Sequence, residues 1–272
     1  MSVLSTGGLA VLAADSGGGG FQAPGPEAFN LPPIFESVGW FTKPILMAAI
    51  SVVLIAVFYL ATSRKMAMVP GKGQFVGEFA YSFIRNNVAR EMIGQQDFQK
   101  FVPYLVALFS FVLVNNIYGV VPFVNFPTNS HIGWPLALAA VSWVVYNAIG
   151  IGRHGFFGYL KNTCLPSGVP AWLYPLIIPM EFLSSIVIRP VTLMLRLFAN
   201  LFAGHLVLMV FALGGTFMLV GSGNGLLAPV GVAAFGLGIA FHFLELLIMA
   251  LQAYIFTVLT ASYISGALAE EH

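Results

Sequence analysis

Apolar residues fill five long stretches of the chain, with short polar segments between them. A helix needs about 20 apolar residues to cross a hydrocarbon core of about 30 Å. The first three stretches, at 44–61, 101–124 and 135–151, have about this length. Each of them predicts one membrane-crossing helix.

The last two apolar stretches, 171–220 and 226–268, are too long for upright spans. At about 1.5 Å per residue, each exceeds the membrane core of about 30 Å, so each must tilt, bend or break. The prolines of the first stretch mark candidate break points, and they are Pro175, Pro179 and Pro190. The glycine-rich run 221–225 ends this stretch, and we expect 171–268 to form an antiparallel helical hairpin.

Two of the segments between the spans have sequence patterns that predict their structure. In 74–92, aromatic and aliphatic residues recur at helical spacing among charged ones, which predicts an amphipathic helix on the membrane surface. Residues 152–170 contain Arg153, Lys161 and several Gly and Pro residues, and predict a loop.

Basic residues give an orientation. Arg64, Lys65, Lys72, Arg85 and Arg90 follow the first span, whereas only Lys43 precedes it. Because basic residues concentrate on the cytoplasmic side, the N-terminus is expected outside and, after five crossings, the C-terminus inside. Residues 1–35 predict a flexible tail; cleavage near Ala13–Ala14 is the alternative, although a basic signal-peptide start is lacking. Residues 36–272 then form a single membrane domain.

Composition agrees with a membrane protein. The chain of 272 residues is 58% apolar and 8% charged, whereas soluble domains carry about 25% charged residues. A net charge of +1 gives no case for nucleic acid, and the single Cys164 excludes a disulfide within the chain. The expected fold class is an all-α polytopic membrane protein.

Ionisable residues inside a membrane are costly and therefore mark candidate functional positions. Within the hairpin they are few, and two amides accompany them: Glu181, Arg189, Arg196, His205, His242 and Glu245, with Asn200 and Gln252. His205 and Glu245 are equidistant from Gly225, and Arg196 and Gln252 are equidistant from Asn224. One antiparallel register therefore predicts that both pairs are level.

The chemistry of these residues fits proton conduction. Arginine keeps its proton, so Arg196 is a fixed positive charge that can attract a carboxylate but cannot relay protons. Histidine titrates near neutral pH, so His205 and Glu245 make an exchange pair. Asn200 and Gln252 can orient water or Arg196 through hydrogen bonds.

Structural alternatives stay open for each of these residues. Arg196 can pair with Glu181 or Glu245, and Glu181 can instead pair with Arg189 or line an inner-side path. Asn200 and Gln252 are, taken alone, ordinary interhelical hydrogen bonds. His242 is interpreted as structural, because it lacks a mirrored partner across the hairpin.

Motifs of other chemistries are absent from the sequence. There is no GxxxxGK[ST] loop for nucleotide, no HExxH metal motif and no GxSxG elbow. The five histidines are scattered without metal-ligand spacing. We therefore expect no cofactor, and no catalysis by the chain on its own.

Three segments resemble one known family. The stretches RPVTLMLRLFANLFAGHLVL at 189–208 and ELLIMALQAYIFTVLTASYISGALAEEH at 245–272 are similar to the signatures of F-type ATP synthase subunit a, and NNIYGVVP at 115–122 resembles a third element. The resemblance implies that Arg196 is the essential arginine facing a carboxylate of a ring of c subunits. It implies an outer half-channel lined by Asn200, His205, Glu245 and Gln252, and an inner-side role for Glu181.

The resemblance also implies partners and a setting. These are the c ring, b-type peripheral stalk subunits, the remaining ATP synthase subunits and the lipid bilayer. The sequence itself does not distinguish H⁺ from Na⁺ as the coupling ion; we expect H⁺, and a bacterial plasma membrane as the location. Three other interpretations compete with this one. A secondary transporter would show paired repeats, and a proton-pumping respiratory subunit would spread Lys and Glu along several helices. A purely structural scaffold would leave Arg196, deep in an apolar stretch, unexplained.

Overall fold

The computed structural model describes residues 43–64, 71–121, 128–164, 173–221 and 225–269. The predicted tail 1–35 lies outside the described residues. Those residues are helical throughout their regular structure, with no strand among them. The α-helices are α2 (Lys43–Arg64), α3 (Lys72–Ile84), α4 (Arg90–Ile93), α5 (Phe98–Ile117), α6 (Gly133–Cys164), α7 (Tyr174–Leu183), α8 (Arg189–Thr216) and α9 (Ala228–Leu268). Short π-helical segments lie at Arg85–Ala89, Ser184–Ile188 and Phe217–Gly221, and 3₁₀ turns at Thr128–Ser130 and Gly225–Leu227.

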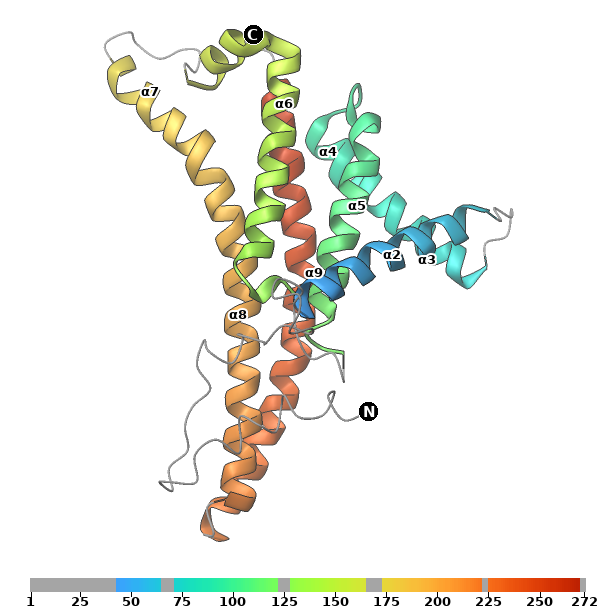
Figure 1. Ribbon diagram of the computed structural model, residues 1–272, viewed down its shortest axis with the longest axis vertical. Helices are drawn as coiled ribbons and strands as arrows, with labels where there is room; N and C mark the ends of the chain where they lie inside the picture. Colours follow the sequence, from blue (N-terminus) through green and yellow to red (C-terminus); the bar gives the residue numbers. More distant parts are fainter. Residues whose placement is uncertain (1–42, 65–70, 122–127, 165–172, 222–224, 270–272) are drawn as a thin grey trace, which may run out of the picture. The chain divides into compact units, whose positions relative to one another are not determined.

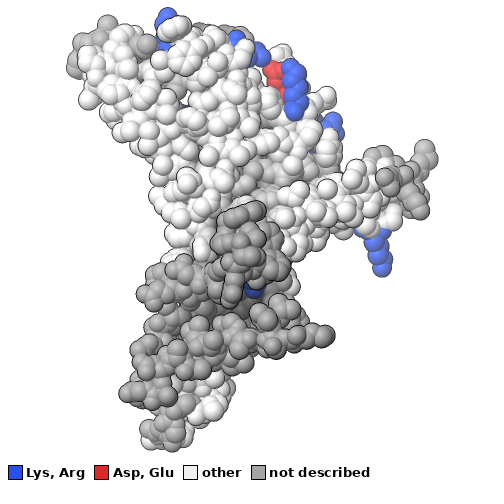
Figure 2. Space-filling view, in the orientation of Figure 1, with Lys and Arg blue, Asp and Glu red and all other residues white. Residues whose placement is uncertain are grey.

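Five helical segments of the described residues are long and apolar enough to cross a membrane. They are Lys43–Ser63, Phe98–Ile117, Gly133–Cys164, Tyr174–Val220 and Gly225–Leu268. Most of the described surface in Figure 2 carries neither basic nor acidic side chains, as expected of a surface that faces lipid. The predicted all-α polytopic fold is confirmed.

Contacts divide the chain into two units. The first, which we call the hairpin unit, contains residues 203–245 and, of the other described residues, Lys43. The second, the bundle unit, contains 44–202 and 246–272. Helices α8 and α9 each contribute residues to both units.

Helix α5, labelled in Figure 1, supplies residues to both hydrophobic clusters of the bundle unit. Its first half packs with the end of α3, the following π-helical segment and the end of α9; this cluster is Ile84, Val88, Ala89, Phe98, Val102, Leu105, Val106, Tyr146, Ala261 and Ile264. Its second half packs with α8 and α9; this cluster is Leu108, Val112, Ala139, Leu193, Leu197, Leu201, Met249, Ala253 and Phe256. The fully buried side chains of α5 therefore fix the stretches of α8 and α9 that belong to this unit.

The amphipathic segment 74–92 is helical, as predicted. Its apolar face divides into two parts, because Ile84 and Val88 are buried while Phe75 and Phe79 are exposed. Phe75 stacks on Phe79, and Phe79 stacks on Phe83. Exposed aromatic rings on a helix of this kind suit a membrane surface.

The prediction of a loop at 152–170 is wrong for residues 152–164, because helix α6 continues to Cys164. Gly155 has a φ of 71°, a conformation that favours glycine, and there the helix bends and resumes. Beyond the bend, the ring of Tyr159 lies against Gly150, where any side chain would collide with it. The Tyr159 hydroxyl donates to Asn147 Oδ1 at 3.0 Å, which fastens the terminal turns to the first part of α6.

Pro190 does not break the helix, although it was one of the predicted break points. The helix passes through a π-helical segment, Ser184–Ile188, immediately before it. Pro190 has no N–H, so one carbonyl in the preceding turn loses its backbone donor. Tyr146 donates to the Ser185 carbonyl at 3.1 Å and Trp143 to the Ile186 carbonyl at 3.0 Å. Two side chains of α6 thus donate to carbonyls at this irregular turn, where carbonyls in a membrane-buried helix need partners.

Candidate functional site

Arg196 lies on the side of α8 that faces away from the bundle core. Leu193, Leu197 and Leu201 are buried against α9, whereas Arg196 is exposed. Arg196 makes no ion pair or hydrogen bond with any residue that the structure describes. The alternative in which it pairs with Glu181 is therefore not realised among these residues. A permanent charge stands exposed on a membrane-crossing helix.

Asn200 stands one turn after Arg196 and binds across to α9. Its Nδ2 donates to Gln252 Oε1 at 2.8 Å. Gln252 is 1% exposed. The predicted register placed Arg196 level with Gln252, whereas the hydrogen bond that forms comes from Asn200. The side-chain amide of Gln252 leaves its Nε2 atom buried without a partner among the described residues.

Glu245 belongs to the hairpin unit and is buried, with 4% of its surface exposed. Gly204 makes room for it, because a Cβ atom added at 204 would lie 2.9 Å from Glu245 Oε1. Both carboxylate oxygens are buried and have no hydrogen-bond partner among the described residues. Burying a carboxylate in this way is costly, so a role that uses the group is favoured over a purely structural one.

His205, next to Gly204 in the chain, is also buried, at 5% exposure. His242 is half-buried on α9, one turn before Glu245. The predicted antiparallel register is confirmed here, since Gly204 approaches Glu245 and Phe211 approaches Gly238. His205 and Glu245 therefore stand at corresponding positions of the two helices of the hairpin unit.

Glycines allow the helices of the hairpin unit to approach closely. A Cβ at Gly231 would lie 2.8 Å from Leu219 Cγ and 3.1 Å from the Gly215 carbonyl oxygen. A Cβ at Gly215 would lie 3.1 Å from the Phe235 ring. Small residues at helix contacts are typical of membrane proteins, in which close packing replaces the hydrophobic effect.

Glu181 and Arg189, the remaining charged candidates, lie in the bundle unit and do not pair with each other. Glu181 is half-buried on α7. The Arg189 guanidinium carbon lies 5.6 Å from the centre of the Tyr263 ring, a cation–π contact. No ion pair of the described residues involves Arg189.

A buried asparagine network is the main feature that sequence reasoning did not assign. Asn129 Nδ2 donates to Asn116 Oδ1 at 2.8 Å, and Asn116 Nδ2 donates to the Met249 carbonyl at 3.2 Å. Ser51 donates to Asn115 Oδ1 at 3.1 Å. The sequence feature that indicates this network is the pair of adjacent amides, Asn115 and Asn116, inside the apolar stretch 101–124. These bonds attach α2 and the Thr128–Ser130 turn to the core helices.

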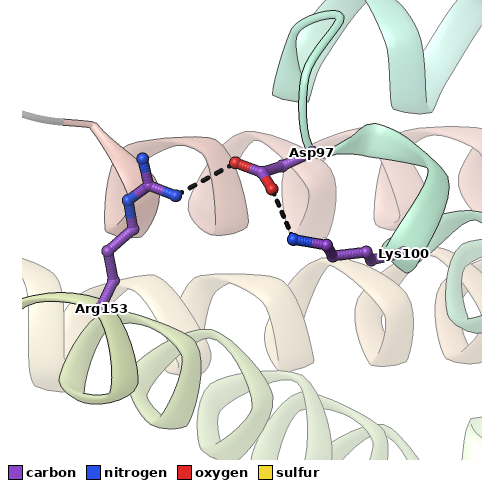
Figure 3. A network of polar contacts seen from close by, with 3 residues as sticks. All are labelled: Asp97, Lys100 and Arg153. Carbon is purple, nitrogen blue, oxygen red and sulfur yellow. Dashed lines mark hydrogen bonds and ion pairs between the residues drawn. The ribbon is translucent and has the colours of Figure 1, made fainter.

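Asp97, the residue before α5, is the centre of a triad of charged side chains (Figure 3). Asp97 accepts from Lys100 at 2.8 Å and from Arg153 at 3.1 Å. The hydrogen bond from Lys100 and the two neighbouring positive charges lower the pKa of Asp97. Among the described residues, no group of three or more His, Cys, Asp or Glu side chains is placed to bind a metal ion.

Comparisons with known proteins identify the family of this chain. The sequence pattern of a family described as "ATP synthase A chain" matches residues 45–265. A protein of a Nocardioides species named ATP synthase subunit a is 51% identical over 266 residues, which cover 94% of this chain and 96% of the relative. A protein of the same name from Pseudarthrobacter chlorophenolicus is 47% identical, over 97% of this chain and 99% of the relative. Another from Streptomyces lividans is 40% identical, over 94% of this chain and 90% of the relative. The chain therefore belongs to the family of ATP synthase subunit a, the proton-channel subunit in the membrane sector of F-type ATP synthases.

Proposed function

We propose that this chain is the stator that carries protons to and from a rotating ring of c subunits through two aqueous half-channels. Proton flow then drives rotation and ATP synthesis, which takes place on other subunits. The chain binds no nucleotide and is not an enzyme by itself. Its proposed partners are the c ring, b-type peripheral stalk subunits and the remaining ATP synthase subunits, and its ion is H⁺.

Arg196 carries this proposal. Its charge is permanent, exposed on a membrane-crossing helix and unpaired within the described residues. An exposed charge in hydrocarbon is costly, and a carboxylate of a partner subunit offsets that cost. Arginine cannot pass a proton onward. Arg196 thus releases the ring carboxylate's proton while preventing direct flow between the two half-channels.

The polar residues of the two units supply the proposed pathways. His205 and Glu245 exchange protons with water in the outer half-channel, and the Asn200–Gln252 hydrogen bond extends a polar surface near Arg196. Glu181, half-buried on α7, is the proposed acidic group of the inner-side path. In domain terms, 36–272 forms one membrane domain, with 171–268 as its translocating hairpin.

The decisive test is Arg196→Ala in the assembled synthase. We expect loss of proton-driven ATP synthesis with assembly intact, because the side chain lies outside the hydrophobic core. Arg90→Ala is the matched control, since Arg90 is an exposed arginine outside the spans. ATP synthesis by inverted vesicles is the measurement. Normal coupled synthesis in Arg196→Ala would disprove the stator function.

We further propose a bacterial plasma membrane location with the N-terminus outside and the C-terminus cytoplasmic. Single cysteines would be placed in a background in which Cys164, a buried free thiol, is replaced by serine. Cysteines in 1–35 and 126–131 should react with an impermeant reagent from outside, and cysteines in 65–72, 153–162 and 268–272 from inside. A C-terminus labelled from outside would refute the five-crossing topology.

A further inference from the structure

A small polar cavity in the bundle unit has no role in the proposed proton pathway. Its volume is about 140 Å³, and its lining is mainly polar. Four elements contribute to it: the end of α6, the π-helical segment, the start of α8 and the end of α9. The lining residues are Tyr159, Asn162, Thr163, Ser185, Arg189, Tyr263, Gly266 and Ala267.

Two groups in this cavity lack the partners that their chemistry requires. Ser185 is 2% exposed, and its Oγ has no hydrogen-bond partner among the described residues. Arg189 is half-buried and joins no ion pair among them. Its described charge contact is with the Tyr263 ring, which leaves its planar fork of N–H donors unsatisfied by any carboxylate.

The lining selects for an anion over a cation or a metal ion. Among the described residues, the lining contains an arginine and several hydroxyl and amide groups but no Asp or Glu. Asn162 is fixed in place by donating one N–H to the Ala269 carbonyl at 3.1 Å, and its second N–H remains available. A cavity of this volume exceeds the space of one water molecule, which is about 30 Å³. It has room for a tetrahedral oxyanion.

We infer that this cavity binds a phosphate group, with Arg189 donating to two of its oxygens and Ser185 to a third. Arginine suits phosphate because its fork donates two parallel, charge-assisted hydrogen bonds. The phosphate belongs either to the headgroup of an anionic phospholipid or to free inorganic phosphate. This inference does not depend on proton translocation.

The bound group would join three helices that meet at one place. Ser185 is in the segment where α7 passes into α8, Arg189 begins α8, and Gly266 and Ala267 lie near the end of α9. An anion there would neutralise a charge that is costly near hydrocarbon. It would also hold the π-helical segment against α6, which already donates to the carbonyls of Ser185 and Ile186.

The test uses the intact membrane sector containing this chain and its partner subunits. In one arm, the sector is placed in lipid nanodiscs of phosphatidylglycerol or phosphatidylcholine, and retained phosphatidylglycerol is counted by native mass spectrometry. In the other arm, its melting temperature is followed against inorganic phosphate, with chloride at equal ionic strength. The variants are Arg189→Gln and Ser185→Ala. The control is Arg153→Gln, an arginine that binds Asp97 instead of the cavity.

We expect phosphatidylglycerol or phosphate to bind the wild-type sector, and Arg189→Gln to weaken binding by roughly ten- to a hundredfold. Ser185→Ala should weaken it less, and Arg153→Gln should leave it unchanged. Retention of phosphatidylglycerol alone identifies a lipid headgroup; stabilisation by phosphate as well identifies a free-anion site. Because Ser185→Ala removes only one hydroxyl, it keeps the test valid if Arg189→Gln fails to assemble.

Three results would overturn the inference. The first is equal binding by Arg189→Gln and Arg153→Gln, which would place the anion elsewhere. The second is absence of any specific phosphate or phosphatidylglycerol effect in the wild-type sector, which would leave the cavity to water. The third is binding that occurs only in a Glu270→Gln, Glu271→Gln double variant, which would make these carboxylates of the chain the natural counter-charge of Arg189.

Discussion

Arg196 and Glu245 are both charged residues of the last two apolar stretches, yet their surroundings are opposite. Arg196, in the bundle unit, is exposed on a helix whose other side is packed with leucines. Glu245, in the hairpin unit, is buried at 4% exposure between glycine-lined helices. The arginine cannot change its charge, whereas a carboxyl group can gain or lose a proton. Arg196 therefore needs a partner of opposite charge outside this chain, whereas Glu245 needs access to protons.

This comparison is tested most strongly at Glu245. Glu245→Gln keeps the shape but removes the titratable group, so passive proton conduction by the membrane sector should fall at least about tenfold while assembly is retained. Conduction is measured in vesicles after the catalytic head has been removed. Arg196→Ala fails for a different reason, because it removes a fixed charge and not a relay.

Exchanging the two groups sharpens the same test. The double variant His205→Glu with Glu245→His keeps one acid and one base at corresponding positions of the hairpin unit. It should conduct better than either single variant, a coupling that a double-mutant cycle detects. If both single variants conduct normally, or if their effects simply multiply, then the two residues do not act as a pair.

The glycine packing of the hairpin unit is expected to have a smaller effect. In Gly231→Ala the new methyl group meets Leu219 Cγ at 2.8 Å and the Gly215 carbonyl oxygen at 3.1 Å. Because the carbonyl cannot move aside without the helix, the sector should lose about 1–3 kcal/mol of stability. Gly236→Ala is the control on the same helix, since nothing lies within 4 Å of its added carbon. Equal melting temperatures for the two variants would contradict the close approach.

The smallest effect is expected at Asp97, which is charged like Glu245 but paired at the protein surface. Its pKa is lowered, first by the hydrogen bond from Lys100, so its contribution to stability is present above the usual aspartate pKa. That contribution is lost as pH falls through the lowered pKa. Asp97→Asn should therefore melt slightly below wild type at pH 7 and equally at a pH below that value. A persistent difference at low pH would assign the effect to packing.

Sequence patterns could predict the features that depend on local periodicity. The five spans and the hairpin register follow from apolar length and from the symmetric spacing of polar residues. The contact of Gly204 with Glu245 agrees with that register. Glu245 could also be identified as a candidate functional residue from its position deep in an apolar stretch, because few charged residues occur there.

Features that depend on distant donors could not be predicted in this way. The helix survives Pro190 because Trp143 and Tyr146, more than 35 residues earlier, bind carbonyls in the turn before it. The bend at Gly155 allows the terminal turns of α6 to form where glycines and prolines predicted a loop. Gln252 binds Asn200 and not Arg196, and equal spacing from a turn does not distinguish two residues that lie one helical turn apart on the same face.

The π-helical segment Ser184–Ile188 also determines where the chain can change its length. A π turn holds one more residue than an α turn. Removing one residue within it would therefore restore ordinary α-helix and leave the directions of the side chains on α7 and α8 nearly unchanged. A deletion within α8 would instead rotate every later side chain by about 100°. After a deletion in the π-helical segment, Pro190 would still lack an N–H, so a carbonyl in the turn before it would still need a donor from α6. This segment is therefore the place where a one-residue deletion between Glu181 and Arg196 disturbs the direction of Arg196 least.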